Sequence, residues 1–335
     1  MTVKFLIIRF SSIGDIVLTT PVIRCLKKQI EGASIHFVTK KKYLPVINQN
    51  PYINKIHVLD NDLKSLIKEL KEERFDYIID LHNNLRSFIL KARLRNSLIF
   101  TYRKLNFQKW LMVVFKKNIL PKKHLVDRYF ETLKLFEVVN DNEGLDFFIE
   151  PKNEINPTSL PLLFHEGYAA IVIGGLHATK QMPAAMVAKI CNGFNGPIIL
   201  LGGNDDRMLA ENVIQLTENV RIFNACGGYT IQQSASIVKQ AKFVITNDTG
   251  LMHIAAAYKQ NIISVWGNTI PEFGMYPYLP NQNFYVFEVR NLKCRPCSKL
   301  GYNKCPLKHF NCMNKQDIDG IINLSNTLFR KETLR

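Results

Sequence analysis

A regular alternation of strand-like and helix-like segments constrains the fold of this chain more than any other feature. Short runs rich in β-branched and aromatic residues predict strands at "KFLIIRF", "SIHFVTK", "KIHVLD" and "FDYIIDLH". Apolar residues at helical spacing predict helices at residues 20–30 and at "DLKSLIKELKEE". Strands that alternate with helices favour a parallel, doubly wound sheet, so the predicted fold class is α/β.

A Pro- and Asn-rich interval, "EPKNEINPTSLP", interrupts this alternation at residues 150–161 and is typical of a linker. A second series follows it, with strands predicted at "YAAIVIGG", "GPIILLGG", "VRIFNA", "KFVITNDTG" and "NIISVWGNT". A length of 335 residues also favours two domains. We therefore predict one domain over residues 1–160 and a second over residues 161–313, with a cleft between them.

The composition of the chain indicates its cellular location and the charge of its binding partner. Hydrophobic residues make up 47% of the chain, and none of its apolar runs has the length of a transmembrane helix. The first residues lack the pattern of a signal peptide, so a cytoplasmic location is expected. The formal net charge of +16 predicts an anionic partner: nucleic acid, an acidic lipid surface or a polyanionic glycan.

The positive charge is concentrated in residues 86–134, which hold thirteen Lys or Arg residues and two acids. The same stretch contains "FQKWLMVVFKK", in which Trp110 and Phe115 stand among lysines. One interpretation is a basic face that binds an anionic membrane surface. The other is a core helix with charged flanks.

The stretch "TNDTGLMHIAAA" predicts a strand that ends at Thr246 and a helix that begins near Gly250. The free N–H groups of the first helical turn can bind a phosphate, and glycine allows a ligand close to the backbone. Asp248 and Thr249 can instead cap the helix, with His253 facing the core. Both interpretations remain open from the residues alone.

Two further glycine turns belong to the same predicted sheet. In "GGLHATKQMP", Thr179 and Lys180 would offer a hydroxyl and a cation to a diphosphate. In "LLGGNDDR", Gly202 and Gly203 would let a flat ring or a ribose lie against the backbone. The chain lacks G-x-x-x-x-G-K-[ST], which excludes P-loop hydrolases, and lacks G-x-G-x-x-G after the first strand, which disfavours dinucleotide dehydrogenases.

The first glycine turn, "SSIGDIV", holds an acid where a phosphate site would have a cation. If the second domain binds the phosphates, Asp15 can act as a general base on an attacking hydroxyl. The alternative is that Asp15 is the N-cap of the following helix, a common position for Asp after Gly.

Several of these motifs, in this order, closely resemble the ADP-heptose:lipopolysaccharide heptosyltransferases, glycosyltransferase family 9. They are "SSIGDIVLTTPVIRCLK", "DLHNNLRS", "HATKQMP", "LLGGNDDR", "TNDTGLMHIAAA" and "CRPCSKLGYNKCPLKHFNCM". The resemblance implies the GT-B fold, two Rossmann-like domains facing a central cleft, with residues 314–335 as a C-terminal helix that crosses back to the first domain. It also implies inverting transfer of heptose from ADP-heptose to the inner core of lipopolysaccharide without a metal or other cofactor.

The resemblance assigns roles to residues. Asp15 matches the catalytic base, and the donor would be bound by Thr179, Lys180, Gly202, Gly203, Asp248, Thr249, Gly250 and His253. The acceptor, an anionic lipid A with its core sugars, would be bound in the first domain by Ser12, Gly14, His82, Asn83 and Arg86. The enzyme would work peripherally at the inner face of the inner membrane. Met182 departs from the family, which often has a large aromatic residue there.

Four cysteines near the C-terminus, Cys294, Cys297, Cys305 and Cys312, have the spacing C-x2-C-x7-C-x6-C. This set suits a structural zinc, whereas the resemblance accounts for the tail as a reduced cluster that shapes a loop near the donor site. Cys25, Cys191 and Cys226 have the character of small core residues.

Two other functions are weighed against heptosyl transfer. One is transfer of a different sugar from a different nucleotide to a cell-surface glycan. The other belongs to a different class, a basic nucleic-acid-binding protein, and the lack of a DNA- or RNA-binding motif argues against nucleic acid as a partner.

Overall fold

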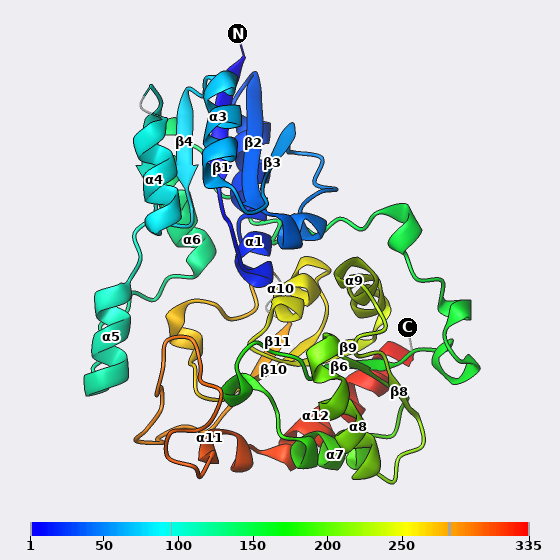
Figure 1. The fold of residues 1–335 in the computed structure, drawn as a ribbon. Helices are drawn as coiled ribbons and strands as arrows, with labels where there is room; N and C mark the ends of the chain where they lie inside the picture. Colours follow the sequence, from blue (N-terminus) through cyan, green and yellow to red (C-terminus); the bar gives the residue numbers. More distant parts are fainter. Residues whose placement is uncertain (1, 95, 281–282, 334–335) are drawn as a thin grey trace. The chain divides into compact units, whose positions relative to one another are not determined.

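The computed structural model of the protein describes residues 2–94, 96–280 and 283–333, and these divide into two compact units. The first unit contains residues 1–105 and 123–148, and the second contains residues 106–122 and 149–335. The structure therefore places the boundary near residue 148 rather than 160. It also assigns the basic segment around residues 106–122 to the second unit. Each unit is described by itself below (Figure 1).

The first unit is built on a five-stranded sheet with the order β3-β2-β1-β4-β5, in which every pairing is parallel. Its strands are β1 (Val3–Ile8), β2 (Ala33–Lys40), β3 (Lys55–Leu59), β4 (Tyr77–Asp80) and β5 (Leu98–Thr101). Its helices are α1 (Ile13–Val17), α2 (Thr20–Gln29), α3 (Leu63–Glu73), α4 (Leu85–Arg93) and α6 (Leu125–Phe130). In Figure 1, α3 and α4 lie against the strands of this sheet.

The second unit contains a six-stranded parallel sheet with the order β11-β10-β9-β6-β7-β8. Its strands are β6 (Ala169–Val172), β7 (Ile198–Leu201), β8 (Ile222–Asn224), β9 (Phe243–Asn247), β10 (Ile262–Trp266) and β11 (Phe284–Glu288). Its helices are α5 (Asn106–Phe115), α7 (Ala184–Gly193), α8 (Arg207–Gln215), α9 (Ile231–Gln240), α10 (Gly250–Ala257), α11 (Asn311–Asn314) and α12 (Ile318–Thr333). The predicted doubly wound α/β architecture is confirmed.

The cores follow the burial that a parallel sheet requires, with apolar strands covered on both faces. In the first unit, Leu6, Ile8 and Ile78 are fully buried. In the second, Ile171 and Ile245 are buried, and α12 contributes Ile321 to the same core. The C-terminal helix thus packs on the second unit, and its predicted return to the first domain stays a prediction.

The predicted linker at residues 150–161 forms short 3₁₀ turns, Pro151–Asn153 and Pro157–Ser159, rather than a strand or an α-helix. No helix among the described residues has the length and apolar character needed to cross a bilayer.

Candidate functional site

The strand order of each sheet marks where a ligand site is expected. In an open parallel sheet, ligands bind beyond the carboxyl ends of the strands, where the chain order reverses. This reversal falls between β1 and β4 in the first unit and between β6 and β9 in the second. The loops after these four strands hold most of the predicted site residues.

In the first unit, Asp15 lies at the third position of α1, the short helix that follows β1. Its carboxylate accepts hydrogen bonds from the Ser12 hydroxyl at 2.8 Å and from the Ser12 backbone N–H at 3.2 Å. The same carboxylate forms an ion pair of 2.7 Å with Arg9, whose side chain is 8% exposed. The N-cap of α1 is Ser12, so the interpretation of Asp15 as the N-cap is wrong; Asp15 instead supports the cap from the third helical position.

Electrostatics keep Asp15 ionised. Burial by itself would raise the pKa of its carboxyl, but the Arg9 guanidinium and the Ser12 hydrogen bonds outweigh burial and hold the pKa below its ordinary value. A carboxylate at neutral pH is the protonation state that a general base needs. The structural role and the proposed chemical role are therefore compatible.

Arg9 is the main residue of this loop cluster that the sequence analysis missed. Its guanidinium donates to the backbone carbonyls of Ser11 and Leu81 and to the hydroxyl of Tyr129. It thereby connects the loop after β1 to the loop after β4. The available signal was a lone buried cation at the end of the apolar run "FLIIRF", since a buried charge requires partners.

The loop after β4 holds the predicted acceptor residues. Burial and the nearby Arg9 lower the pKa of His82 to about 4, so the imidazole is neutral at pH 7. Asn83 adopts a left-handed conformation with φ of 49° and donates its amide to the carbonyl of Tyr102. Arg86 is exposed in the first turn of α4. Gly14, by contrast, is buried within α1.

In the second unit, the loops after β6 and β9 are joined by an ion pair. Lys180 Nζ lies 2.6 Å from Asp248 Oδ2, and the hydroxyl of Thr269 donates to the same carboxylate at 3.0 Å. The Asn247 amide, at the end of β9, donates to the carbonyls of Gly174 and Lys180. Lys180 is thus held in place from both sides, with its ammonium beside the start of α10.

The N-terminus of α10 is not capped by a side chain. Thr249 occupies the N-cap position without a side-chain hydrogen bond to the helix, and the Asp248 carboxylate is engaged by Lys180. The first N–H groups of the helix have no intrahelical acceptor, and the helix dipole favours an anion there. Of the two interpretations, the geometry favours the anion site over the capped helix. His253, one turn further, is buried.

Thr179 is 2% exposed, and its hydroxyl is used within the protein. The hydroxyl donates to the carbonyl of Tyr302 at 3.1 Å and accepts the Tyr302 N–H at 2.8 Å. Its direct contact with a diphosphate stays a prediction. In the structure it connects the Lys180 turn to the cysteine-rich tail.

The two glycines after β7 differ in the space that a side chain would have at each position. A Cβ on Gly202 would lie 2.8 Å from the Cβ of Asp206 and 3.1 Å from the sulfur of Cys226, so the packing itself requires glycine. Gly203 is exposed, and its nearest obstruction to a Cβ lies at 3.6 Å. Asp206 also accepts a hydrogen bond from Gln181, which links this turn to the loop after β6.

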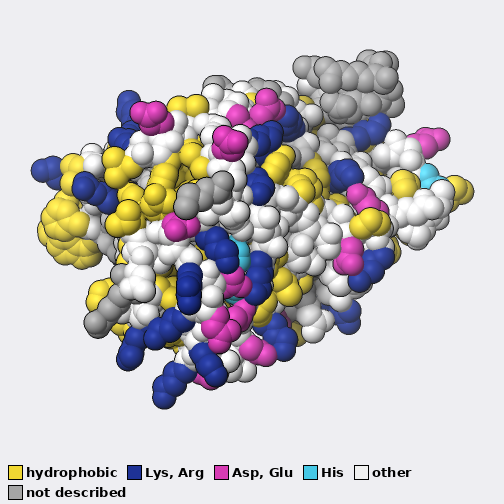
Figure 2. All heavy atoms as spheres, turned by 90° about the horizontal axis from the view of Figure 1, so that it is seen from above, with side chains coloured by type: hydrophobic (Ala, Val, Ile, Leu, Met, Phe, Trp, Pro, Cys, Tyr) yellow, Lys and Arg dark blue, Asp and Glu magenta, His cyan; other side chains and the backbone are white. Residues whose placement is uncertain are grey.

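The basic segment contains α5, which has no buried residue. The exposed fractions are 63% for Phe107, 45% for Trp110 and 63% for Phe115. The interpretation of α5 as a core helix is therefore wrong. Figure 2 shows one face of the molecule on which many Lys and Arg side chains are interspersed with acidic and hydrophobic ones.

The family model described as glycosyltransferase family 9 (heptosyltransferase) matches residues 63–304. The chain is 23% identical to the lipooligosaccharide heptosyltransferase 2 of Campylobacter jejuni, and the match covers 96% of this chain and 97% of the relative.

Two solved structures share the fold. A family 9 glycosyl transferase from Veillonella parvula superposes with a TM-score of 0.79 at 21% identity, covering 98% of this chain and 97% of that one. The Escherichia coli heptosyltransferase WaaC, solved with ADP-2-deoxy-2-fluoro heptose, superposes with a TM-score of 0.65 at 19% identity, covering 93% and 98%. The fold is GT-B, and the chain belongs to glycosyltransferase family 9, the heptosyltransferase family.

Proposed function

We propose that this enzyme transfers heptose from ADP-heptose to the inner core of lipopolysaccharide, with inversion at the anomeric carbon. The observation that carries the proposal is that Lys180, paired with Asp248, and the uncapped N-terminus of α10 lie in the loops after β6 and β9, at the reversal point of the second sheet. These groups suit a sugar nucleotide, whose diphosphate gains charge as the sugar departs.

The donor half of the reaction requires stabilisation of the leaving ADP. Lys180 supplies a full positive charge, and the first N–H groups of α10 supply oriented dipoles in the same place. Asp248 and Thr269 hold the lysine in position before the donor arrives. This arrangement supports transfer without a divalent cation at the diphosphate. Brief exposure to a chelator should accordingly leave the turnover number unchanged.

The acceptor half requires removal of one proton. In the proposed step, the acceptor hydroxyl oxygen bonds to the anomeric carbon on the face opposite ADP, and the bond from that carbon to the phosphate oxygen breaks. The hydroxyl proton passes to Asp15, which Arg9 and Ser12 keep ionised and oriented. Because Asp15 is a weakened base, the proton moves late, when the attacking oxygen has become acidic.

A membrane-bound acceptor also requires the enzyme to reach a bilayer surface. The exposed aromatic residues of α5 and the lysines beside them suit an interface with anionic headgroups. Lys117, the second residue after the helix, is exposed. We propose that α5 makes this peripheral contact. Lys116 is less available, because its ammonium donates to the carbonyls of Cys294 and Pro296.

The donor assignment is tested by thermal unfolding with a panel of nucleotide sugars. A ligand that binds only the folded state raises the unfolding temperature according to its concentration and affinity. ADP-heptose should stabilise the protein more than UDP- or GDP-sugars at equal concentration. Equal effects of all the sugars, or a larger effect of single-stranded nucleic acid, would contradict the proposal.

A further inference from the structure

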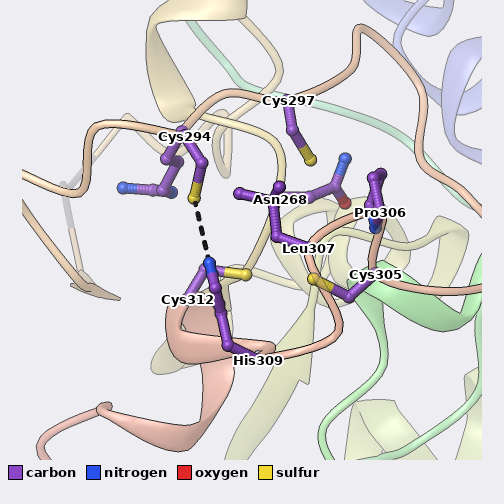
Figure 3. A pocket seen from close by; sticks show the side chains of 9 residues that line it. Asn268, Cys294, Cys297, Cys305, Pro306, Leu307, His309 and Cys312 are labelled. Carbon is purple, nitrogen blue, oxygen red and sulfur yellow. Dashed lines mark hydrogen bonds between the residues drawn. The ribbon is translucent and has the colours of Figure 1, made fainter.

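The cysteine-rich tail forms a compact cluster that the transfer reaction does not use. Figure 3 shows the sulfur atoms of Cys294, Cys297, Cys305 and Cys312 directed toward one small cavity. Its volume is about 30 Å³, which is room for one water molecule or one ion and not for an organic ligand. All four cysteines are reduced, and Cys312 is buried.

A buried amide side chain that lacks hydrogen-bond partners lines the same cavity. Asn268 is 1% exposed and lines the cavity, yet neither its side-chain nitrogen nor its side-chain oxygen has a hydrogen-bond partner. A buried amide without partners costs free energy, and native structures rarely tolerate it without a reason. A thiolate sulfur would accept a hydrogen bond from this amide, whereas a neutral thiol is a weak acceptor.

The orientation of the His309 ring also favours a thiolate at Cys294. Its Nδ1 accepts a hydrogen bond from the Asn311 backbone N–H at 3.0 Å, so the ring proton lies on Nε2. Nε2 faces the sulfur of Cys294 at 3.9 Å. The imidazole is therefore oriented to donate to that sulfur, which is the arrangement of a group that supports a thiolate ligand rather than one that binds a metal itself.

Two basic side chains lie near the four cysteines. The Lys116 ammonium donates to the carbonyls of Cys294 and Pro296. The Arg295 side chain, which also lines the cavity, donates to the carbonyls of Gly267 and Thr269.

We propose that Cys294, Cys297, Cys305 and Cys312 bind one divalent metal ion as thiolates, in a closed tetrahedral site that suits Zn²⁺ or Fe²⁺. Soft sulfur ligands and a C-x2-C pair favour these ions. Four sulfur–metal bonds form as four S–H protons pass to solvent, and the complex carries a net double negative charge. Asn268 and His309 donate hydrogen bonds to its sulfurs, and the Lys116 ammonium beside the cluster offsets part of its charge.

The site is structural, because four protein ligands leave no open position for a substrate or a water molecule. Its position explains what it stabilises. Tyr302, in the middle of the loop, shares three hydrogen bonds with Thr179, and the Asn268 backbone N–H donates to the Thr179 carbonyl. The metal therefore fixes the segment that supports the turn of Lys180. This consequence for catalysis rests on the proposed function, but metal binding itself does not.

Another group of ligand atoms lies in the first unit and is less suitable. Among the described residues, the ligand atoms of His36, His57 and Glu73 lie within 4.8 Å of one another, closer than the four sulfurs do. Yet Glu73 already pairs with Lys4 at 3.1 Å and Lys55 at 2.6 Å, and the two imidazoles hydrogen-bond to each other at 2.9 Å. These partners satisfy the group without an ion. The thiols, by contrast, line a cavity in which the buried Asn268 amide has no hydrogen-bond partner.

Elemental analysis of the full-length protein, purified under reducing conditions without chelator, tests the proposal. We expect one zinc or iron ion per chain, and the analysis distinguishes the two metals. The double variant C297S/C305S should lose the ion, whereas the control C191A, whose thiol lies in the core of the second unit, should retain it. Retention of the metal by the double variant would overturn the assignment of ligands.

A second measurement does not depend on the folding of any variant. Wild-type protein that has been stripped of metal and loaded with Co²⁺ should show the absorption bands of tetrahedral cobalt and of sulfur-to-cobalt charge transfer, and Zn²⁺ should abolish both. A protein that contains no zinc or iron and develops no thiolate–cobalt spectrum would overturn the proposal. Because neither readout involves a sugar nucleotide, each result stands whether or not the proposed transfer reaction is confirmed.

Discussion

Replacing Asp15 by asparagine separates its structural role from its proposed chemical role. The amide can still accept hydrogen bonds from Ser12, but it no longer neutralises Arg9. Breaking a buried ion pair costs about 3–5 kcal/mol. Because Arg9 keeps the carbonyls of Ser11 and Leu81 as partners, we expect a loss of free energy of unfolding of about 3 kcal/mol.

This loss is too small to mimic a catalytic defect. Domains are typically stable by about 5–15 kcal/mol, so even at the lower limit a remainder of about 2 kcal/mol would keep roughly 97% of the molecules folded. Removing a general base lowers turnover by roughly 10²–10⁴-fold. A fall of that size in D15N, measured at saturating donor and acceptor, therefore cannot arise from unfolding.

The control is D141N, in the same unit. Asp141 pairs with Arg24 at 2.8 Å, and the two side chains are 22% and 3% exposed, close to the values of 19% and 8% for Asp15 and Arg9. Because Arg24 keeps its ion pair with Asp146, urea unfolding should show a smaller loss of stability in D141N than in D15N. Turnover should fall only in D15N. Equal turnover in D15N and D141N would refute the role of Asp15 as a base.

Three further predictions concern the donor, the membrane and pH. K180A should weaken ADP binding by about 10–100-fold in calorimetry, because a charge-assisted contact is lost, while the control K239A, in an exposed pair with Glu154, should bind normally. The double variant F107S/W110S should sediment less with anionic liposomes than the wild type. The control L216S, which removes an apolar residue of similar exposure, should sediment like the wild type. Equal sedimentation of all three proteins would exclude α5 as the membrane contact. Burial, reinforced by His57, lowers the pKa of His36 to about 4. Between pH 6.5 and 4 the unfolded state therefore binds more protons than the folded state, so the free energy of unfolding falls as pH falls, by at most about 3 kcal/mol. H36Q should flatten this pH dependence in urea titrations at several pH values.

The alternating pattern was sufficient to predict the parallel sheets and the loops that carry the site. Buried parallel strands are apolar along their whole length and end in glycine or polar turns, so β1, β4, β6 and β9 were recognisable from local residues. The edge strands β5 and β11 were not predicted. β5 has exposed and half-buried residues only, so its pattern resembles that of a loop.

The partners of the site residues could not be predicted, because they lie far apart in the sequence. Arg9 contacts Tyr129 across 120 positions, and Lys180 contacts Asp248 across 68. The sequence motifs located Asp15 and Asp248, but only the fold showed that Arg9 weakens the first as a base and that Lys180 removes the second from capping. The hydroxyl of Thr179 likewise found an unexpected partner in Tyr302.

An assay of the transfer reaction is the most direct test of inverting heptosyl transfer from ADP-heptose. The enzyme, purified without chelator, is incubated with ADP-heptose of known anomeric configuration and a phosphorylated lipid A acceptor that carries its acidic core sugars, without an added divalent ion. We expect that the acceptor gains the mass of one heptose, that one ADP is released per transfer, and that nuclear magnetic resonance shows the opposite anomeric configuration in the product. Retention of configuration, or transfer that requires an added divalent ion, would contradict the account.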